Sequence, residues 1–207
     1  MTRILIVDDH AMIRTGLKQL CAELLPGASI LEACDGQTAL GLQKEAPKLT
    51  ILDLNMPGLS GLELLRRLLE TDIQARVLVF SMHGEPVYAA RVMEIGARGY
   101  LSKNASPEEL RRAISRVLSG STYVEADMAQ QLVALPSEQR QHLSERDLEI
   151  LRLLGEGRSF TEIAQQLGLG YKTVANAATA IKSKLGVART ADLIRLSVEM
   201  GIGRQTS

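Results

Sequence analysis

Residues 51–57, ILDLNMP, form a short apolar run that ends on a carboxylate and passes directly into a loop. If the run is a strand of a parallel sheet, Asp53 lies at the C-terminal edge of that strand. Open α/β sheets bind their ligands at this edge. Asp53 is therefore the first candidate for a functional residue.

On both sides of this run, short apolar segments alternate with segments of helical periodicity. The predicted strands are residues 4–7, 29–33, 49–52, 77–80 and 99–101. The predicted helices are residues 11–25, 38–46, 61–70, 87–95 and 107–118, and most of them stop at Pro or Gly. Five such β/α repeats within residues 1–120 predict an α/β fold with a doubly wound, five-stranded parallel sheet of the flavodoxin-like type.

Polar side chains follow the first, third, fourth and fifth of these strands: Asp8 and Asp9, Asp53, Ser81, and Ser102 with Lys103. Because the ends of parallel strands share one edge of the sheet, we expect them to lie close together. Clustered carboxylates repel one another, and Mg2+, which prefers oxygen ligands, would relieve the repulsion. Lys103 and Ser81 would then contact a transferred phosphoryl group. The pattern predicts Asp53 as the nucleophile that becomes an aspartyl phosphate.

Two other interpretations of Asp53 are open at this point. A single acidic residue after a strand is most often a turn or capping residue, although four polar strand ends in succession argue against that role. Phosphatases of the dehalogenase type also use an aspartyl nucleophile after a strand. Their pattern has a second acid two residues later, where this chain has Asn55.

The first 120 residues resemble the receiver domain of bacterial two-component response regulators. The resemblance is carried by VDDH at 7–10, DLNMPGLSG at 53–61, Ser81, and GYLSK at 99–103. It implies that a sensor histidine kinase phosphorylates Asp53. It implies that Mg2+ is held by Asp8, Asp9, Asp53 and the main-chain carbonyl of Asn55. It also implies a conformational switch made by Ser81 and Tyr100, in which Ser81 moves toward the phosphate and Tyr100 turns inward, with Lys103 bonded to the phosphoryl group.

Residues 121–142 are polar and contain Pro136, which predicts a linker with a possible short helix at 127–135. From residue 143 to 207 the periodic segments are all helical and predict a small all-α domain. Ser144 and Ser159 each precede an acidic residue by three positions and predict capping boxes. Two helices joined by a turn at 168–170 have the helix-turn-helix layout.

The helix predicted at 171–185 has two unlike faces. One carries Val174, Ala178, Ile181 and Leu185 at helical spacing and should be buried. The other is small and polar, and it is either a solvated surface or a surface that enters a DNA groove. We expect the following residues to contact double-stranded DNA, with the lysines on phosphates and Asn176 on an adenine edge: Lys172, Thr173, Ala175, Asn176, Thr179, Lys182 and Lys184.

Residues 143–201 resemble the LuxR-type helix-turn-helix of the NarL/FixJ regulators, chiefly at 143–151, 162–164, 173–174 and 181–187. Those proteins usually have Ser, a basic residue and His where this chain has Gly170, Ala175 and Ala177. The two resemblances together imply a transcription regulator, not an enzyme, that forms homodimers when phosphorylated. Leu193, Leu196 and Met200 are candidates for the dimer interface or for the core of the domain. Because Ala175 lacks the usual charge, a second unit that binds a protein partner is the alternative.

The composition of the chain restricts its function and location less strongly than the motifs do. The 24 basic and 24 acidic side chains balance overall, and residues 143–207 carry a small basic excess that permits DNA binding without requiring it. No apolar run approaches the roughly 20 residues of a membrane span, and the first run is too short for a signal peptide. We therefore expect a cytoplasmic protein with no membrane partner. Cys21 and Cys34 are expected to be buried, reduced thiols.

Overall fold

The computed structural model describes residues 2–56, 59, 61–82, 86–134, 143–185 and 187–199. It divides into two compact units, which are considered separately below. The first comprises Met1–Gly84 and Ala89–Gln130, and the second comprises Glu85–Tyr88 and Gln131–Ser207.

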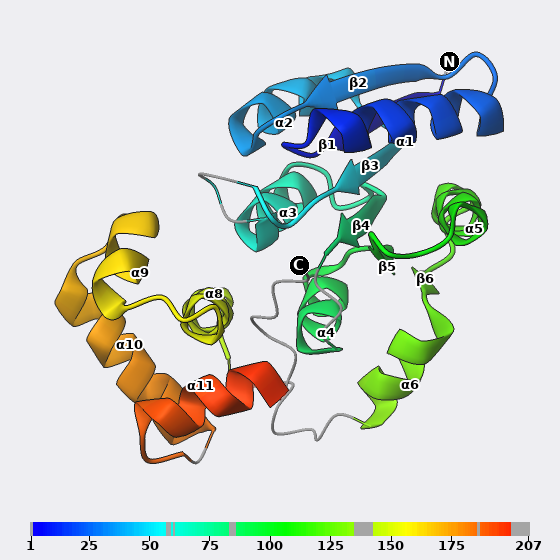
Figure 1. Ribbon diagram of the computed structural model, residues 1–207. Helices are drawn as coiled ribbons and strands as arrows, with labels where there is room; N and C mark the ends of the chain where they lie inside the picture. The colour runs from blue at the N-terminus through cyan, green and yellow to red at the C-terminus, as the bar shows by residue number, and fades with distance from the viewer. Residues whose placement is uncertain are drawn as a thin grey trace. The chain divides into compact units, whose positions relative to one another are not determined.

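A parallel sheet of order β2-β1-β3-β4-β5-β6 forms the centre of the first unit (Figure 1). Its strands are β1 (Arg3–Val7), β2 (Ser29–Ala33), β3 (Leu49–Leu52), β4 (Val77–Ser81), β5 (Gly99–Ser102) and β6 (Tyr123–Val124). The residues of β3 and β4 are all buried, and β1 and β5 are buried at all but one position each. Continuous apolar runs form these strands because helices cover both faces of the sheet.

The sheet has one strand more than the five predicted. The extra strand, β6, pairs with the outer edge of β5 through Gly99 with Tyr123 and Tyr100 with Val124. Two residues cannot produce a periodic pattern, so β6 is recognisable only from its partner strand. The segment predicted as a linker, 121–142, therefore begins with a strand of the sheet, and α6 (Ala126–Ala134) follows where a short helix was expected.

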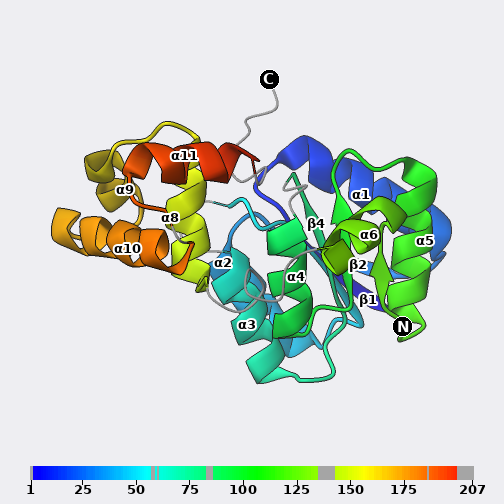
Figure 2. The same ribbon diagram turned by 90° about the horizontal axis from the view of Figure 1, so that it is seen from below.

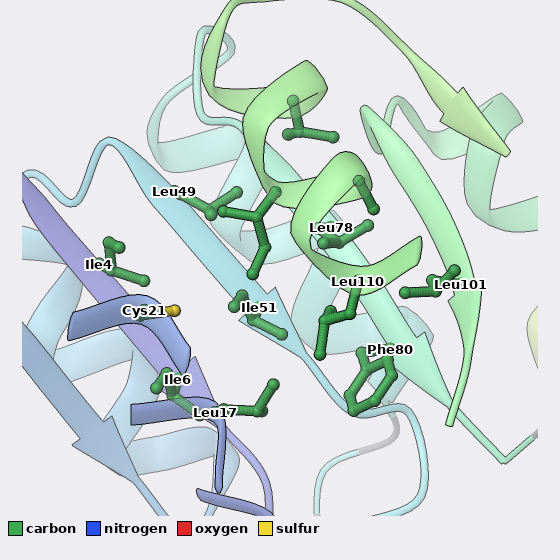
Figure 3. Packing of buried hydrophobic residues seen from close by; sticks show 13 residues of the cluster. Ile4, Ile6, Leu17, Cys21, Leu49, Ile51, Leu78, Phe80, Leu101 and Leu110 are labelled. Carbon is green, nitrogen blue, oxygen red and sulfur yellow. The ribbon is translucent and has the colours of Figure 1, made fainter. Parts of the chain in front are cut away.

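Helices lie on both faces of the sheet (Figure 2). One face carries α1 (Ala11–Leu24) and α5 (Pro107–Leu118). The other carries α2 (Gly36–Leu42) with the 3-10 turn η1 (Gln43–Glu45), α3 (Gly61–Thr71) and α4 (Pro86–Ile95). Under α1 and α5 the core is a single apolar cluster (Figure 3), whose members include Ile4, Ile6, Leu17, Cys21, Leu49, Ile51, Leu78, Phe80, Leu101 and Leu110.

The second unit contains α8 (Glu145–Gly155), α9 (Phe160–Gln166), α10 (Tyr171–Lys184) and α11 (Thr190–Glu199). Both predicted capping boxes are confirmed. The side chains of Ser144 and Ser159 each accept a hydrogen bond from the main-chain N–H three residues later, and the acidic side chain at that position accepts one from the main-chain N–H of the serine. Gly168 ends α9 with a φ of +64°, a conformation that glycine adopts without strain.

The predicted buried face of α10 is largely confirmed. Val174, Ala178 and Ile181 are at most 1% exposed, whereas Leu185 is half-buried. These side chains pack on α8 and α9 and set the orientation of the opposite face of α10. Within the described ranges, no helix combines the length and apolar content that a membrane crossing requires.

Candidate phosphoacceptor site and DNA-binding surface

Two carboxylates are fixed side by side at the C-terminal edge of the sheet. Val7 and Leu52 are paired in the register of β1 with β3, and each is followed directly by an acid, Asp8 and Asp53. The main chain continues the ladder past the strands, since Asp53 donates its N–H to Val7 O at 2.8 Å. Both acids are 1% exposed. The sheet register thus brings together two of the predicted site residues.

Lys103 supplies the positive charge for this pair. Its Nζ lies 2.7 Å from Asp8 Oδ2 and 2.7 Å from Asp53 Oδ2, and its side chain is 4% exposed. Its own N–H donates to Ser81 O at 2.9 Å, which fixes the main chain at the end of β5. Burial acts to lower the pKa of Lys103, but the charges and hydrogen bonds of Asp53 and Asp8 outweigh it, and the pKa is raised. Lys103 is therefore held as an ammonium ion between two buried acids.

Further polar groups surround the pair. Asn55 donates its main-chain N–H to Asp53 Oδ1 at 3.1 Å. Within the described residues, Asp9 Oδ1 is buried and accepts no hydrogen bond, and His10 Nδ1 lies 2.7 Å from it. Ligand atoms of Asp8, Asp9, His10 and Asp53 all lie within 4.8 Å of one another. An oxygen-rich set with one unsatisfied buried oxygen fits a hard divalent cation such as Mg2+.

His10 was not identified from the sequence as part of this site. Its side chain is 64% exposed, but Nδ1 faces Asp9 and also lies 3.3 Å from Asp8 Oδ1. Its position directly after the two acids was the available signal.

The two predicted switch residues lie on neighbouring strands. Ser81 ends β4 and is fully buried, and Tyr100 lies within β5, paired with Val79 and 1% exposed. The switch implied by the family resemblance has the tyrosine turning inward after phosphorylation. In this structure the ring of Tyr100 is already buried, so entry from solvent is not required.

Gly61 lies against the main chain next to Asp53. A Cβ atom at Gly61, the first residue of α3, would lie 2.3 Å from Leu54 Cα and 2.5 Å from Leu54 O. No side chain fits in that space. The glycine lets α3 begin against the segment that directly follows Asp53.

The opposite face of α10 presents most of the predicted DNA contacts to solvent. Lys172, Thr173, Asn176 and Thr179 are exposed, and Ala175 and Lys182 are half-buried. Thr179 donates its hydroxyl hydrogen to Ala175 O at 3.0 Å, which leaves its oxygen lone pairs facing outward. The surface is small, polar and positive at its two ends.

The three lysines of this surface differ in their partners. Lys184 forms an ion pair with Asp147, the third residue of α8, and so joins the end of α10 to the start of α8. In the part of the chain that the structure describes, Lys172 and Lys182 form no ion pair. These two lysines are accordingly free to meet phosphates, whereas Lys184 would first have to release Asp147.

One of the three dimer candidates belongs to the core. Leu193 is fully buried within the chain, so it is not available as a subunit contact in this conformation. The side chain of Leu196 and the whole of Met200 lie outside the described residues.

The fold and these two surfaces define a class of protein: a phosphoacceptor domain followed by a helix-turn-helix domain. Comparison with known families agrees. Residues 4–115 match the response regulator receiver domain, and residues 141–197 match the bacterial regulatory proteins of the luxR family. The chain belongs to the two-component response regulators with a LuxR-type DNA-binding domain, and it is a DNA-binding transcriptional regulator.

The similarity to known proteins extends over nearly the whole chain. Transcriptional activator protein ExaE of Pseudomonas putida is 42% identical over 97% of this chain and 98% of its own length. Response regulator UvrY of Escherichia coli strain K12 is 32% identical over 98% of this chain and 96% of its own length. Among solved structures, the chain resembles RcsB from Salmonella enterica serovar Typhimurium, which was solved bound to promoter rprA with the phosphomimetic BeF3-. The TM-score is 0.71 and the identity is 25%, over 94% of this chain and 98% of that chain. The match of residues 141–197 to the luxR family supports the helix-turn-helix interpretation of the second unit.

Proposed function

We propose that Asp53 accepts a phosphoryl group from a sensor histidine kinase and that the phosphorylated protein binds double-stranded DNA as a homodimer. The observation that carries the proposal is the position of Lys103, whose ammonium contacts two buried carboxylates at the ligand-binding edge of the sheet. A buried lysine placed there can follow the charge that phosphorylation adds.

The transfer step follows from the groups present. A carboxylate oxygen of Asp53 attacks the phosphorus of a phosphohistidine, and the O–P bond forms as the P–N bond breaks. The kinase imidazole leaves with the electron pair of that bond and takes a proton from solvent. Mg2+, held by Asp8, Asp9, Asp53 and the carbonyl of Asn55, would neutralise charge on the transferred group.

Lys103 and Ser81 have separate roles in the product. The aspartyl phosphate carries about two negative charges and three acceptor oxygens. Lys103 stays paired with this charge, and the Ser81 hydroxyl donates a hydrogen bond to one of the new oxygens. Movement of Ser81 then changes the packing beside Tyr100, which would carry the signal away from the site.

The recognition helix would combine two kinds of contact. Lys172, Lys182 and, after release of Asp147, Lys184 hold phosphates and supply affinity without sequence information. Thr173, Ala175, Asn176 and Thr179 face the bases, with Asn176 suited to adenine and Ala175 to a thymine methyl group. The lack of a basic side chain at Ala175 predicts a weaker contribution of electrostatics than is usual for this kind of helix.

The decisive experiment is selection of bound sequences from a random duplex pool, with and without acetyl phosphate. We expect a two-fold symmetric motif that appears or strengthens with phosphorylation, and the same protein with Asp53→Asn should give no such gain. If phosphorylation of Asp53 is intact but no sequence is enriched in either state, the proposed link between the site and DNA recognition is wrong.

A further inference from the structure

The main-chain N–H groups of residues 102–105, in the loop that carries Lys103, all donate hydrogen bonds. One of these bonds is accepted by a side chain that follows β6. The N–H of Lys103 donates to Ser81 O at 2.9 Å, that of Asn104 to Ser102 Oγ at 3.2 Å, and that of Ala105 to Ser102 O at 3.0 Å. The N–H of Ser102, the last residue of β5, donates to Glu125 Oε1 at 3.2 Å. The side chain of Glu125 is thus the acceptor for the residue directly before Lys103.

The short length of β6 explains this arrangement. β6 pairs with β5 only at Gly99 and Tyr100 and then ends at Val124. A longer strand would offer a main-chain carbonyl to Ser102. Glu125, the next residue, provides a carboxylate oxygen in its place and so satisfies a part-buried N–H that would otherwise lack a partner.

Glu125 is also the residue that connects β6 to α6. It directly precedes α6, the helix through which the chain leaves the sheet toward the DNA-binding domain in sequence. A pocket of about 240 Å3 lies beside it, and its lining includes Asn104, Glu109 and Asp127. Burial raises the pKa of Glu125, the hydrogen bond from Ser102 acts to lower it, and the charges of Glu109 and Asp127 act to raise it, so that the pKa is raised overall. The hydrogen bond from Ser102 is therefore the contact that stabilises the charged carboxylate of Glu125 in these surroundings.

We propose that Glu125 is a positioning residue: it holds the Lys103 loop through Ser102 and couples phosphorylation of Asp53 to the start of α6. The inference rests on the proposed role of Lys103. When the ammonium of Lys103 follows the phosphoryl group, the main chain of its loop shifts, and the adjacent bond from Ser102 to Glu125 changes with it. Because this bond joins the loop to the residue before α6, its loss would change both the loop and the start of α6.

Four variants of the full-length protein separate this role from a general effect on stability. Glu125→Gln keeps an acceptor of the same length and removes the charge. Glu125→Asp keeps the charge but is one methylene too short, and Glu125→Ala removes both. Asp127→Ala is the matched control, because it removes a neighbouring acid from the same pocket but keeps the hydrogen bond from Ser102 to Glu125.

The measurement is hydrogen–deuterium exchange of peptides covering residues 99–105 and 123–130, with mass analysis of Asp53 in the same samples. Before phosphorylation we expect exchange at Ser102 to be roughly tenfold faster in Glu125→Asp and Glu125→Ala. Glu125→Gln and Asp127→Ala should match the parent protein. With acetyl phosphate and Mg2+, the parent and Glu125→Gln should show a change at 123–130 that Glu125→Asp lacks.

The outcomes are distinguishable. Unchanged exchange at Ser102 in Glu125→Asp and Glu125→Ala overturns the proposal without reference to phosphorylation. A parent protein whose Asp53 is phosphorylated but whose residues 123–130 do not respond also overturns it and leaves the proposed function intact. If Asp53 of the parent is never phosphorylated, the proposed function fails and the coupling fails with it.

Discussion

Lys103 Nζ lies 2.7 Å from Asp53 Oδ2, in a site where both side chains are almost wholly buried. Such a contact is strong because little water screens it, and it is costly to break because either partner alone would be a buried charge. The same geometry that stabilises the resting site also keeps an ammonium ion within reach of any group transferred to Asp53. Under the proposed function, stability and signalling therefore both depend on the ammonium of Lys103.

Replacing the nucleophile tests the site directly. Asp53→Asn keeps the shape of the side chain but removes the attacking oxygen anion, so we expect no labelling by acetyl phosphate. Intact-mass measurement after incubation with Mg2+ checks this. Asp35→Asn, at the half-buried N-cap of α2, is the control and should be labelled normally. A persistent phosphoryl adduct in Asp53→Asn would remove Asp53 from its role.

Removing the buried ammonium should reduce stability in a pH-dependent way. Lys103→Met leaves two buried carboxylates without a cation and should cost about 3–5 kcal/mol at neutral pH. Because the folded-state pKa of Lys103 is raised, its contribution is fully present below the unfolded value of about 10.4 and is lost as the pH rises through the folded value. Urea unfolding of both proteins from pH 7 to 11 measures the difference.

The control for that series is Lys44→Met, at an exposed position, which should show a small difference at every pH. A gap between the parent and Lys103→Met that already closes well below pH 10 would contradict the raised pKa.

Two glycines in helices should respond oppositely to alanine. Gly61→Ala forces a methyl group against the main chain of Leu54 and should destabilise the protein by about 1–3 kcal/mol while slowing the labelling of Asp53. Gly16→Ala lies within α1, where nothing lies within 4 Å of the added Cβ, and should stabilise by about 0.5–1 kcal/mol. Thermal unfolding compares them, and equal effects would show that the close approach to Leu54 has no influence.

The two cysteines should differ in reactivity. Cys21 is fully buried, and burial raises the pKa of its thiol to about 11, so only about one molecule in a thousand is thiolate at pH 8. Cys34 is exposed. Iodoacetamide should therefore give a single adduct on the folded protein at Cys34 and none in Cys34→Ser, whereas urea should expose Cys21. Rapid modification of Cys21 in the native state would contradict its burial.

The lysines of α10 should contribute unequally to DNA binding. Lys172→Ala and Lys182→Ala should each lower the slope of log affinity against log salt by about 0.9 for each bound chain, since each loses one phosphate contact. Lys184→Ala should lower it less, because this lysine is held by Asp147, and should also weaken the contact between α8 and α10. Fluorescence anisotropy at several salt concentrations measures the slopes, with Lys44→Ala as the control. Equal slopes for all four variants would rule out the proposed contact surface.

The edge of the sheet was predictable because its residues are local features repeated in order. Asp8, Asp53, Ser81 and Lys103 each follow or end a recognisable apolar run, and parallel pairing of the strands brings those ends to one edge. The faces of α10 were predictable for a similar reason, because helical periodicity separates Val174 and Ala178 from Asn176. In both cases a short-range pattern is sufficient.

Other contacts had no such pattern. β6 is two residues long, and the pairing of Lys184 with Asp147 joins positions 37 residues apart in sequence. The acceptor role of Glu125 depends on where β6 ends beside β5, which no property of residue 125 itself reveals.

The sequence by itself determined the first five strands and the helices between them, the capped starts of α8 and α9, and the kinds of side chain present at the strand ends. It could do so because these features depend on residues within a few positions of one another. Only the tertiary structure decided which charges pair: that one ammonium serves both Asp8 and Asp53, that Lys184 is engaged by Asp147, and that Glu125 completes the loop before Lys103. Those pairings depend on strand register and helix packing, which bring distant residues within 3.2 Å or less.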